Sequence, residues 1–207
     1  GAPVEDFSIP SNYPRKKIRS MGRVSLLAAR ATELAIENSG LILDDISNPK
    51  TGLVYGSTYP SPSAMGQLAT KLYSGSMEGL SGSEYLKTMS HTCVINLAQF
   101  FQITGRVLPV CSACTSGSQS IGIAYEAIKY GKQEVMLAGG ADELHFAVAA
   151  VFNIMFATST RNHEPNKTPR PFDLNRDGLV VGEGASTLVL ESLSHARKRS
   201  ANILGEL

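Results

Sequence analysis

The sequence predicts an α/β fold, because strand patterns alternate with helical patterns along most of the chain. Four short apolar segments are typical of buried strands: 51–58, 106–113, 134–140 and 184–192. Helical spacing fills the intervals between them, as in strand–helix–strand units. The composition is that of a globular protein, with 43% hydrophobic and 18% charged residues among 207.

The first half of the chain begins with a helix predicted over 23–39, which Gly40 ends. A strand follows at 51–58. Residues 60–88 are rich in Ser and Gly and predict loops and helices without clear bounds. A second helix is predicted over 91–103. The buried face of the first helix is expected from apolar residues at helical spacing: Val24, Leu27, Ala28, Ala31, Leu34 and Ala35.

The second half is more regular. A strand at 106–113 leads into a helix over 115–130, which Gly131 ends, and a strand at 134–140 precedes an apolar helical stretch over 146–156. Residues 159–178 form a long polar loop, and such loops within compact domains are usually functional or disordered. A strand at 184–192 and the start of a helix in 194–204 complete the pattern.

Charge and cysteine content argue against several classes of protein. Lys and Arg total 19 against 18 Asp and Glu, and this near-neutral balance argues against a nucleic-acid binder. Three cysteines do not form a disulfide framework and suit a reducing compartment, so we expect a cytoplasmic protein. No apolar run approaches the ~18 residues of a membrane span, and no signal peptide is recognisable. The low charged fraction predicts surface buried against a partner.

The segment CSACTSGSQSIG carries the clearest chemical signal. Here the strand reaching Cys111 turns into a helix whose first turn is expected to hold Cys114. Unpaired backbone N–H groups and the helix dipole favour a thiolate at such a position, which makes Cys114 a candidate nucleophile. The small residues Ser116 and Gly117 would let a substrate carbonyl approach, and the Cys114 N–H could donate to a developing oxyanion.

Other readings of these residues are weaker. A zinc site formed with His91, Cys93, Cys111 and Cys114 lacks two tight ligand pairs, so we expect no metal. A redox pair is disfavoured because the first cysteine lies in the strand. We expect Cys93 and Cys111 to be small buried residues packed under a helix. The segments GEGAST and GGADE lack the spacing of nucleotide-binding loops.

The motifs together resemble the β-ketoacyl-acyl-carrier-protein synthases, the elongating condensing enzymes of the thiolase superfamily. The resemblance covers 15–207 and rests on the segments CSACTSGSQSIGIAYEAIKYGKQEVMLAGGADE, STRN, RPFDLNRDG and VVGEGASTLVLESLSHARKR. It implies a thiolase-like layered α/β/α/β/α fold with mixed sheets. The resemblance further implies that residues 1–207 are a partial, N-terminal half of that fold, without the family's opening strand and C-terminal half.

The resemblance implies a role for Cys114. It matches the cysteine that takes an acyl group from the carrier protein and then loses it to the carbanion formed by decarboxylation of malonyl-carrier protein. No cofactor is expected on the chain itself, because phosphopantetheine arrives on the acyl-carrier protein.

Further positions match the family's binding residues. Arg15, Lys16 and Arg19 match a basic helix start that docks the acidic carrier protein; the alternative is an ordinary solvated face.

Three positions match the acyl pocket: Tyr59, Phe152 and Leu179. Leu179 stands where the family commonly has phenylalanine. Tyr59 is expected to shorten the pocket, or alternatively to pack at a subunit contact.

Two histidines and a lysine needed by the family's mechanism have no match here. The four histidines of the chain lie outside the family's motifs: His91, His145, His163 and His195. Activity of residues 1–207 alone is therefore in doubt. The expected partners are an acyl-carrier protein and a second copy in a homodimer, with no nucleic acid and no membrane. The alternatives are a non-catalytic carrier-protein-binding partner and a coenzyme A-dependent thiolase.

Overall fold

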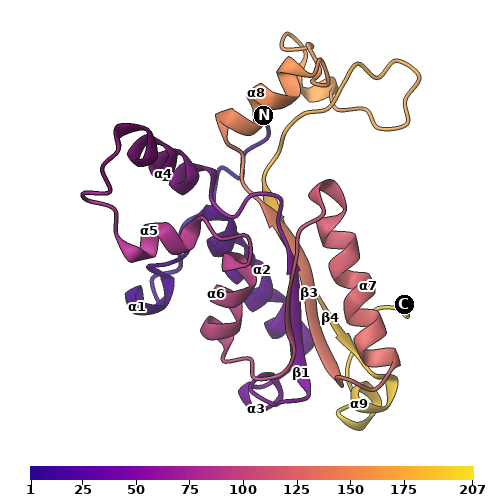
Figure 1. Cartoon of the computed structure of the whole chain (residues 1–207). Coiled ribbons are helices and arrows are strands. Elements are labelled where there is room, and N and C mark those ends of the chain that lie inside the picture. Colours follow the sequence, from indigo (N-terminus) through magenta and orange to yellow (C-terminus); the bar gives the residue numbers. More distant parts are fainter.

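The computed structural model describes all residues from 1 to 207 and contains one four-stranded mixed sheet in the order β2-β1-β3-β4 (Figure 1). The strands are β1 (Thr51–Gly56), β2 (Val107–Val110), β3 (Val135–Asp142) and β4 (Gly184–Glu191). β1 runs parallel to β2 and to β3, whereas β4 is antiparallel to β3. Leu53 marks the register, because it pairs with Val107 on one side and Leu137 on the other.

The larger core lies on the sheet face covered by α2 (Arg23–Ser39) and α6 (Thr92–Phe101). Leu53 and Leu137 from the sheet and Leu97 from α6 are fully buried there. Tyr55 shares this face, and its hydroxyl lies 3.1 Å from the Thr187 hydroxyl, which is 3.0 Å from that of Thr32. This chain of hydroxyl groups joins β1, β4 and α2, and burial raises the pKa of Tyr55.

The smaller core lies on the opposite face, under α7 (Ser116–Lys129). Val54, Met136 and Ala138 are fully buried between this helix and the sheet. Because successive strand residues point to opposite faces, Val54 and Tyr55 contribute to different cores. Figure 1 shows α7 on one side of the strands and α2 with α6 on the other. The sheet is therefore the middle of three layers.

The remaining helices are short or lie at the periphery. Helix α4 (Pro62–Ser74) begins after Ser61, whose hydroxyl accepts a hydrogen bond from Ala64 N. Figure 1 shows α8 (Phe146–Ile154) and the chain that follows it projecting beyond one end of the sheet. The peripheral helices are α1 (Arg15–Ile18), α3 (Leu43–Ile46), α4 (Pro62–Ser74), α5 (Gly82–Lys87), α8 (Phe146–Ile154) and α9 (Leu193–Lys198), and two 3₁₀ turns span Ala113–Thr115 and Pro165–Lys167.

Two expectations about burial are wrong. Leu34 is 45% exposed, because α2 turns the small and hydroxyl-bearing residues Ser25, Ala29 and Thr32 toward the sheet. Cys111 is exposed rather than packed, because it follows the last residue of β2, an edge strand. Cys93 is buried as expected, and its burial raises the pKa of its thiol to about 12. None of the helices combines the length and apolar character that crossing a membrane requires.

Candidate active site

Cys114 lies on a tight turn between β2 and α7. The turn is a single 3₁₀ turn over Ala113–Thr115, so α7 itself begins two residues after Cys114 rather than around it. Ala113 has a φ of +50°, a left-handed conformation that costs a non-glycine residue about 1–3 kcal/mol. The Ser116 hydroxyl stabilises this conformation by accepting from Ser112 N at 2.9 Å and donating to Ala113 O at 2.7 Å.

The Cys114 side chain is exposed, so a substrate can reach it. No turn or loop hydrogen bond between backbone groups engages the Cys114 N–H. An exposed sulfur beside a free backbone donor is what nucleophilic attack on a carbonyl group requires, because the donor can bind the oxygen that becomes negative.

Two glycines let the start of α7 approach the sheet. A Cβ atom on Gly56, at the end of β1, would lie 2.7 Å from backbone atoms of Ser116. A Cβ atom on Gly140, in β3, would lie 3.1 Å from the Cα atom of Gly117. Any larger side chain at these positions would push α7 away. The glycines therefore set the position of the Cys114 turn.

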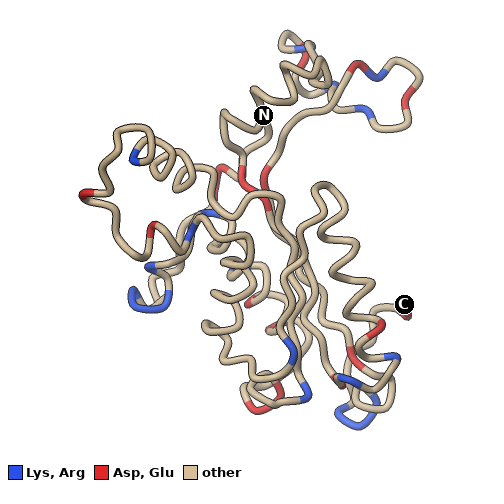
Figure 2. The backbone as a smooth tube through the Cα atoms, in the orientation of Figure 1, with Lys and Arg blue, Asp and Glu red and all other residues tan.

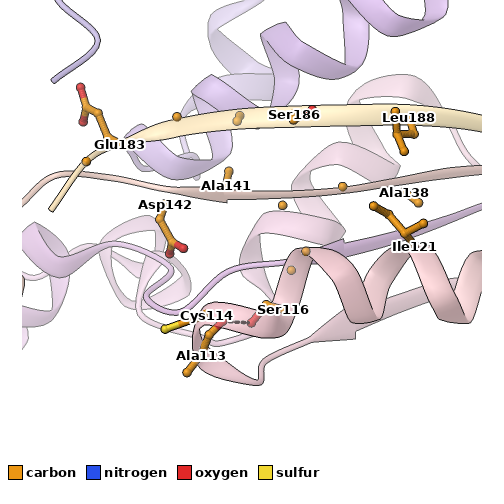
Figure 3. Close-up of a pocket in the computed structure, with 17 residues that line it drawn as sticks. Ala113, Cys114, Ser116, Ile121, Ala138, Ala141, Asp142, Glu183, Ser186 and Leu188 are labelled. Atoms are coloured by element: carbon orange, nitrogen blue, oxygen red, sulfur yellow. Dashed lines mark hydrogen bonds between the residues drawn. The ribbon is translucent and has the colours of Figure 1, made fainter. Parts of the chain in front are cut away.

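An open cavity of about 510 Å³ adjoins the turn (Figure 3). It lies where the carboxyl ends of β1 and β3 meet the start of β4, which is where ligands commonly bind in open α/β sheets. Its lining includes Cys114, Asp142, Glu183 and Ser186, with Ile121 and Leu188 supplying apolar surface.

Asp142 fixes the loop that follows β1. Its carboxylate accepts a hydrogen bond from Thr58 N at 2.9 Å and from the Ser57 hydroxyl at 3.3 Å. The same Ser57 hydroxyl lies 2.9 Å from the carbonyl oxygen of Tyr59, to which it can also donate. In Figure 3 the Asp142 side chain points from β3 toward the side of the cavity on which Cys114 lies. The acid that ends the AGGAD segment thus orders the loop carrying Tyr59.

Glu183 forms an ion pair with Arg23 at the other end of the cavity lining. Its side chain is only 3% exposed, and its Oε1 lies 2.5 Å from Arg23 Nη2. This hydrogen bond lowers the pKa of Glu183 to about 2. Neighbouring Glu143 is buried without a comparable partner, and desolvation raises its pKa. Sequence reasoning did not assign a role to Asp142 or Glu183, although both lie in segments that carry the resemblance.

The structure does not bring the three predicted pocket residues to this cavity. Tyr59 is 40% exposed on the loop after β1. Phe152 is half-buried on α8, and Leu179 lines a separate cavity of about 500 Å³ with Arg170 and Val180. Their role in an acyl pocket stays a prediction.

The predicted docking residues lie together on an exposed surface. Arg15, Lys16 and Arg19 are exposed on and just after α1 and take part in no ion pair. Figure 2 shows Lys and Arg positions gathered at this segment. Lys17, between them, donates instead to Phe100 O at 2.9 Å. Two cations of α1 and one just after it are thus free of ion pairs within the chain.

The cavity beside Cys114 has neither a histidine nor a metal-binding group in its lining. His195 lies 2.7 Å from Glu191 at the far end of β4, and His145 caps the N-terminus of α8. No cluster of three or more His, Cys, Asp or Glu side chains is arranged to hold a metal ion.

Residues 7–196 match the family model described as "Beta-ketoacyl synthase, N-terminal domain". The chain is 39% identical over 203 residues to 3-oxoacyl-[acyl-carrier-protein] synthase 1 of Haemophilus influenzae, covering 96% of this chain and 50% of that protein. It is 36% identical over 197 residues to the enzyme of the same name from Escherichia coli strain K12, covering 93% and 48%. The chain therefore spans about half the length of these curated relatives.

Solved structures show the same likeness. A β-ketoacyl synthase from Burkholderia phymatum is 52% identical with a TM-score of 0.93, covering 97% of this chain and 50% of that one. A type II PKS ketosynthase, solved in complex with its acyl-carrier protein, is 27% identical with a TM-score of 0.81, covering 89% and 47%. These matches confirm the predicted thiolase-like α/β fold. The chain belongs to the β-ketoacyl synthase family.

Proposed function

We propose that the complete protein is a β-ketoacyl-acyl-carrier-protein synthase of fatty-acid or polyketide-type chain elongation, with Cys114 as its acyl-accepting nucleophile. The observation that carries the proposal is the exposed Cys114 sulfur on a strained turn beside an open cavity. The names of relatives that match nearly the whole chain support the same activity.

The first step is acyl transfer. The Cys114 sulfur attacks the thioester carbonyl of the acylated carrier protein, and the resulting oxyanion accepts a hydrogen bond from the Cys114 N–H. Collapse of this intermediate forms the acyl thioester of Cys114 and breaks the bond to the carrier's sulfur. The proton lost from Cys114 is recovered by that leaving sulfur, so the charge balances.

The second step is condensation. Malonyl-carrier protein loses carbon dioxide, and the electron pair of the broken bond becomes a carbanion that attacks the Cys114 thioester. A carbon–carbon bond forms, the bond to the Cys114 sulfur breaks, and the released thiolate takes up a proton. No histidine lines the cavity beside Cys114.

Two partners fit this activity. The free cations of α1 suit an acidic acyl-carrier protein, and a similar ketosynthase was solved with its own carrier protein. The position of β2 supports a homodimer. This edge strand pairs only with β1, so the backbone groups on its other side can pair with a second copy of the chain. The free thiols of all three cysteines support a cytoplasmic, reducing environment.

The test is labelling of the full-length protein by radiolabelled acyl-carrier protein and, separately, by acyl-coenzyme A. We expect label from the carrier protein, loss of label in Cys114→Ser, and carbon dioxide release from malonyl-carrier protein. Cys111→Ser is the matched control, because Cys111 is also exposed and lies three residues away.

Each other outcome contradicts the proposal in a different way. Labelling from acyl-coenzyme A without carbon dioxide release would favour a thiolase. Absence of label from either donor would favour a non-catalytic partner that binds the carrier protein. Equal loss of label in the two cysteine variants would show that Cys114 is not the sole acyl acceptor.

A further inference from the structure

Residues 145–182, which we call the arm, project from the sheet between β3 and β4 (Figure 1). The arm includes α8, which has no buried residue. Phe146 and Ile154 of this helix are 78% and 73% exposed. Burial of apolar side chains therefore does not hold the arm in place, and other contacts at its base must do so.

The Glu183 carboxylate occupies the base of the arm. Its Oε1 accepts hydrogen bonds from Val4 N at 2.8 Å and Arg23 Nη2 at 2.5 Å. Its Oε2 accepts from Arg23 Nε at 2.9 Å and Leu144 N at 3.1 Å. Leu144 lies where the chain leaves β3 for the arm, and Glu183 lies where it returns to β4. One carboxylate thus joins both ends of the arm to α2 and to the N-terminal segment.

Backbone pairing reinforces this junction. Ala2 N donates to Val181 O at 2.8 Å, and Glu183 N donates to Ala2 O at 3.1 Å. The N-terminal residues therefore run beside the returning end of the arm. The Arg23 guanidinium provides the charged contact with Glu183, because it binds both carboxylate oxygens at once.

The junction connects the arm to the Cys114 cavity. Glu183 lines this cavity together with its neighbour Gly184. The arm carries Phe152 and Leu179, two of the three positions at which the family resemblance implies contact with the acyl chain. Any movement about the junction would change the position of these side chains relative to Cys114.

We propose that Glu183 is a positioning residue, whose carboxylate fixes the arm relative to the Cys114 cavity and thereby sets the acyl chain length that the enzyme accepts. The inference rests on the condensing activity proposed above. It assigns no chemical step to Glu183, which acts through the placement of the arm.

The test compares Glu183→Gln with Glu191→Gln in the full-length protein. Glu191 is a matched control, because it ends β4, the strand that Glu183 precedes, and pairs with Arg199 and His195, with a side chain 9% exposed. Each substitution removes one negative charge from a shielded ion pair. Only Glu183→Gln is expected to raise amide hydrogen exchange of residues 145–182, by about tenfold or more, without a matching rise in the sheet.

The second readout is the ratio of condensation rates for short and long acyl chains. A general loss of folded protein lowers every rate by one factor and leaves this ratio unchanged. We expect Glu183→Gln to change the ratio at least about threefold and Glu191→Gln to preserve it. Arg23→Lys keeps the positive charge but cannot bind both carboxylate oxygens of Glu183 at once. It should change the ratio of rates by an intermediate amount, and it replaces Glu183→Gln in the test if that variant does not fold.

Equal exchange of the arm in the two glutamine variants would overturn the proposal. So would faster exchange of the arm with an unchanged ratio of rates, because the arm would then not set chain length. If the unsubstituted protein takes no acyl group at Cys114, the proposed function fails. The exchange comparison still decides in that case whether Glu183 holds the arm.

Discussion

Gly56→Ala is expected to displace Cys114 while leaving the protein folded. The added methyl group would lie 2.7 Å from the carbonyl carbon, carbonyl oxygen and Cβ of Ser116. Ordinary van der Waals contact begins at 3.4 Å, so the start of α7 must retreat by about 0.7 Å, the difference between these distances. Overpacking of this kind costs about 1–3 kcal/mol of stability. A misplacement of about 1 Å can lower a catalysed rate by ~100-fold.

The assay is the initial rate of acyl transfer to Cys114 in the full-length protein, beside urea denaturation. We expect the rate to fall by about 10–100-fold and the free energy of unfolding by about 1–3 kcal/mol. Gly52→Ala is the matched control, because its methyl group would lie 2.6 Å from Met136 Sδ at the opposite end of β1. It should lose stability but keep the rate per folded molecule. Equal losses of rate in the two variants would refute the role of Gly56 in placing Cys114.

Three further predictions concern the acyl pocket, the docking surface and acid stability. The family resemblance puts Tyr59 in the acyl pocket, so Tyr59→Gly is expected to lengthen the acyl chains accepted; an unchanged chain-length profile counts against this. Replacing Lys16 and Arg19 by Glu should raise KM for the acyl-carrier protein about tenfold with little change in kcat, and the effect should shrink with added salt. Identical KM values at low salt would show that α1 is only a solvated face. The pKa of Glu183 is lowered from 4.5 to about 2 by its hydrogen bond to Arg23. Its ionised form therefore contributes stability that is fully present above about pH 4.5 and lost as the pH falls toward 2. In urea titrations the wild type and Glu183→Gln should converge across that range, and a constant gap between them would contradict this account.

Local sequence signals predicted the elements well where the cause is local. The helix expected over 23–39 is α2 (Arg23–Ser39), and Gly40 ends it with a φ of +71°. The sequence likewise predicts a strand-to-helix turn at Cys114, because small residues follow a strand and precede a helical pattern, but Cys114 lies on a 3₁₀ turn before α7 rather than in the first turn of that helix. The exposure of Cys111 was missed, because being at a sheet edge depends on strand order rather than on neighbouring residues.

The spacing of apolar residues along the sequence also did not predict which face of α2 is buried. Apolar spacing favoured Leu34, yet the helix turns Thr32 inward, where its hydroxyl lies 3.0 Å from that of Thr187. Thr187 in turn lies 3.1 Å from the Tyr55 hydroxyl. A polar residue is favourable inside the core only when its partner is already there, and the partner of Thr32 is 155 residues away along the chain. The same long-range dependence applies to Glu183, whose Arg23 partner lies in α2.

The paired glycines of β3 show why the site and the core cannot be separated. Gly139 and Gly140 are adjacent and so face opposite sides of the sheet. A Cβ atom on Gly139 would lie 2.7 Å from the ring of Tyr55, so this glycine makes room for the buried ring that reaches Thr187. A Cβ atom on Gly140 would lie 3.1 Å from Gly117, so this glycine makes room for α7 and the Cys114 turn. The first glycine makes room for a buried core residue and the second sets the position of Cys114, the proposed nucleophile, and one strand supplies both because its side chains alternate.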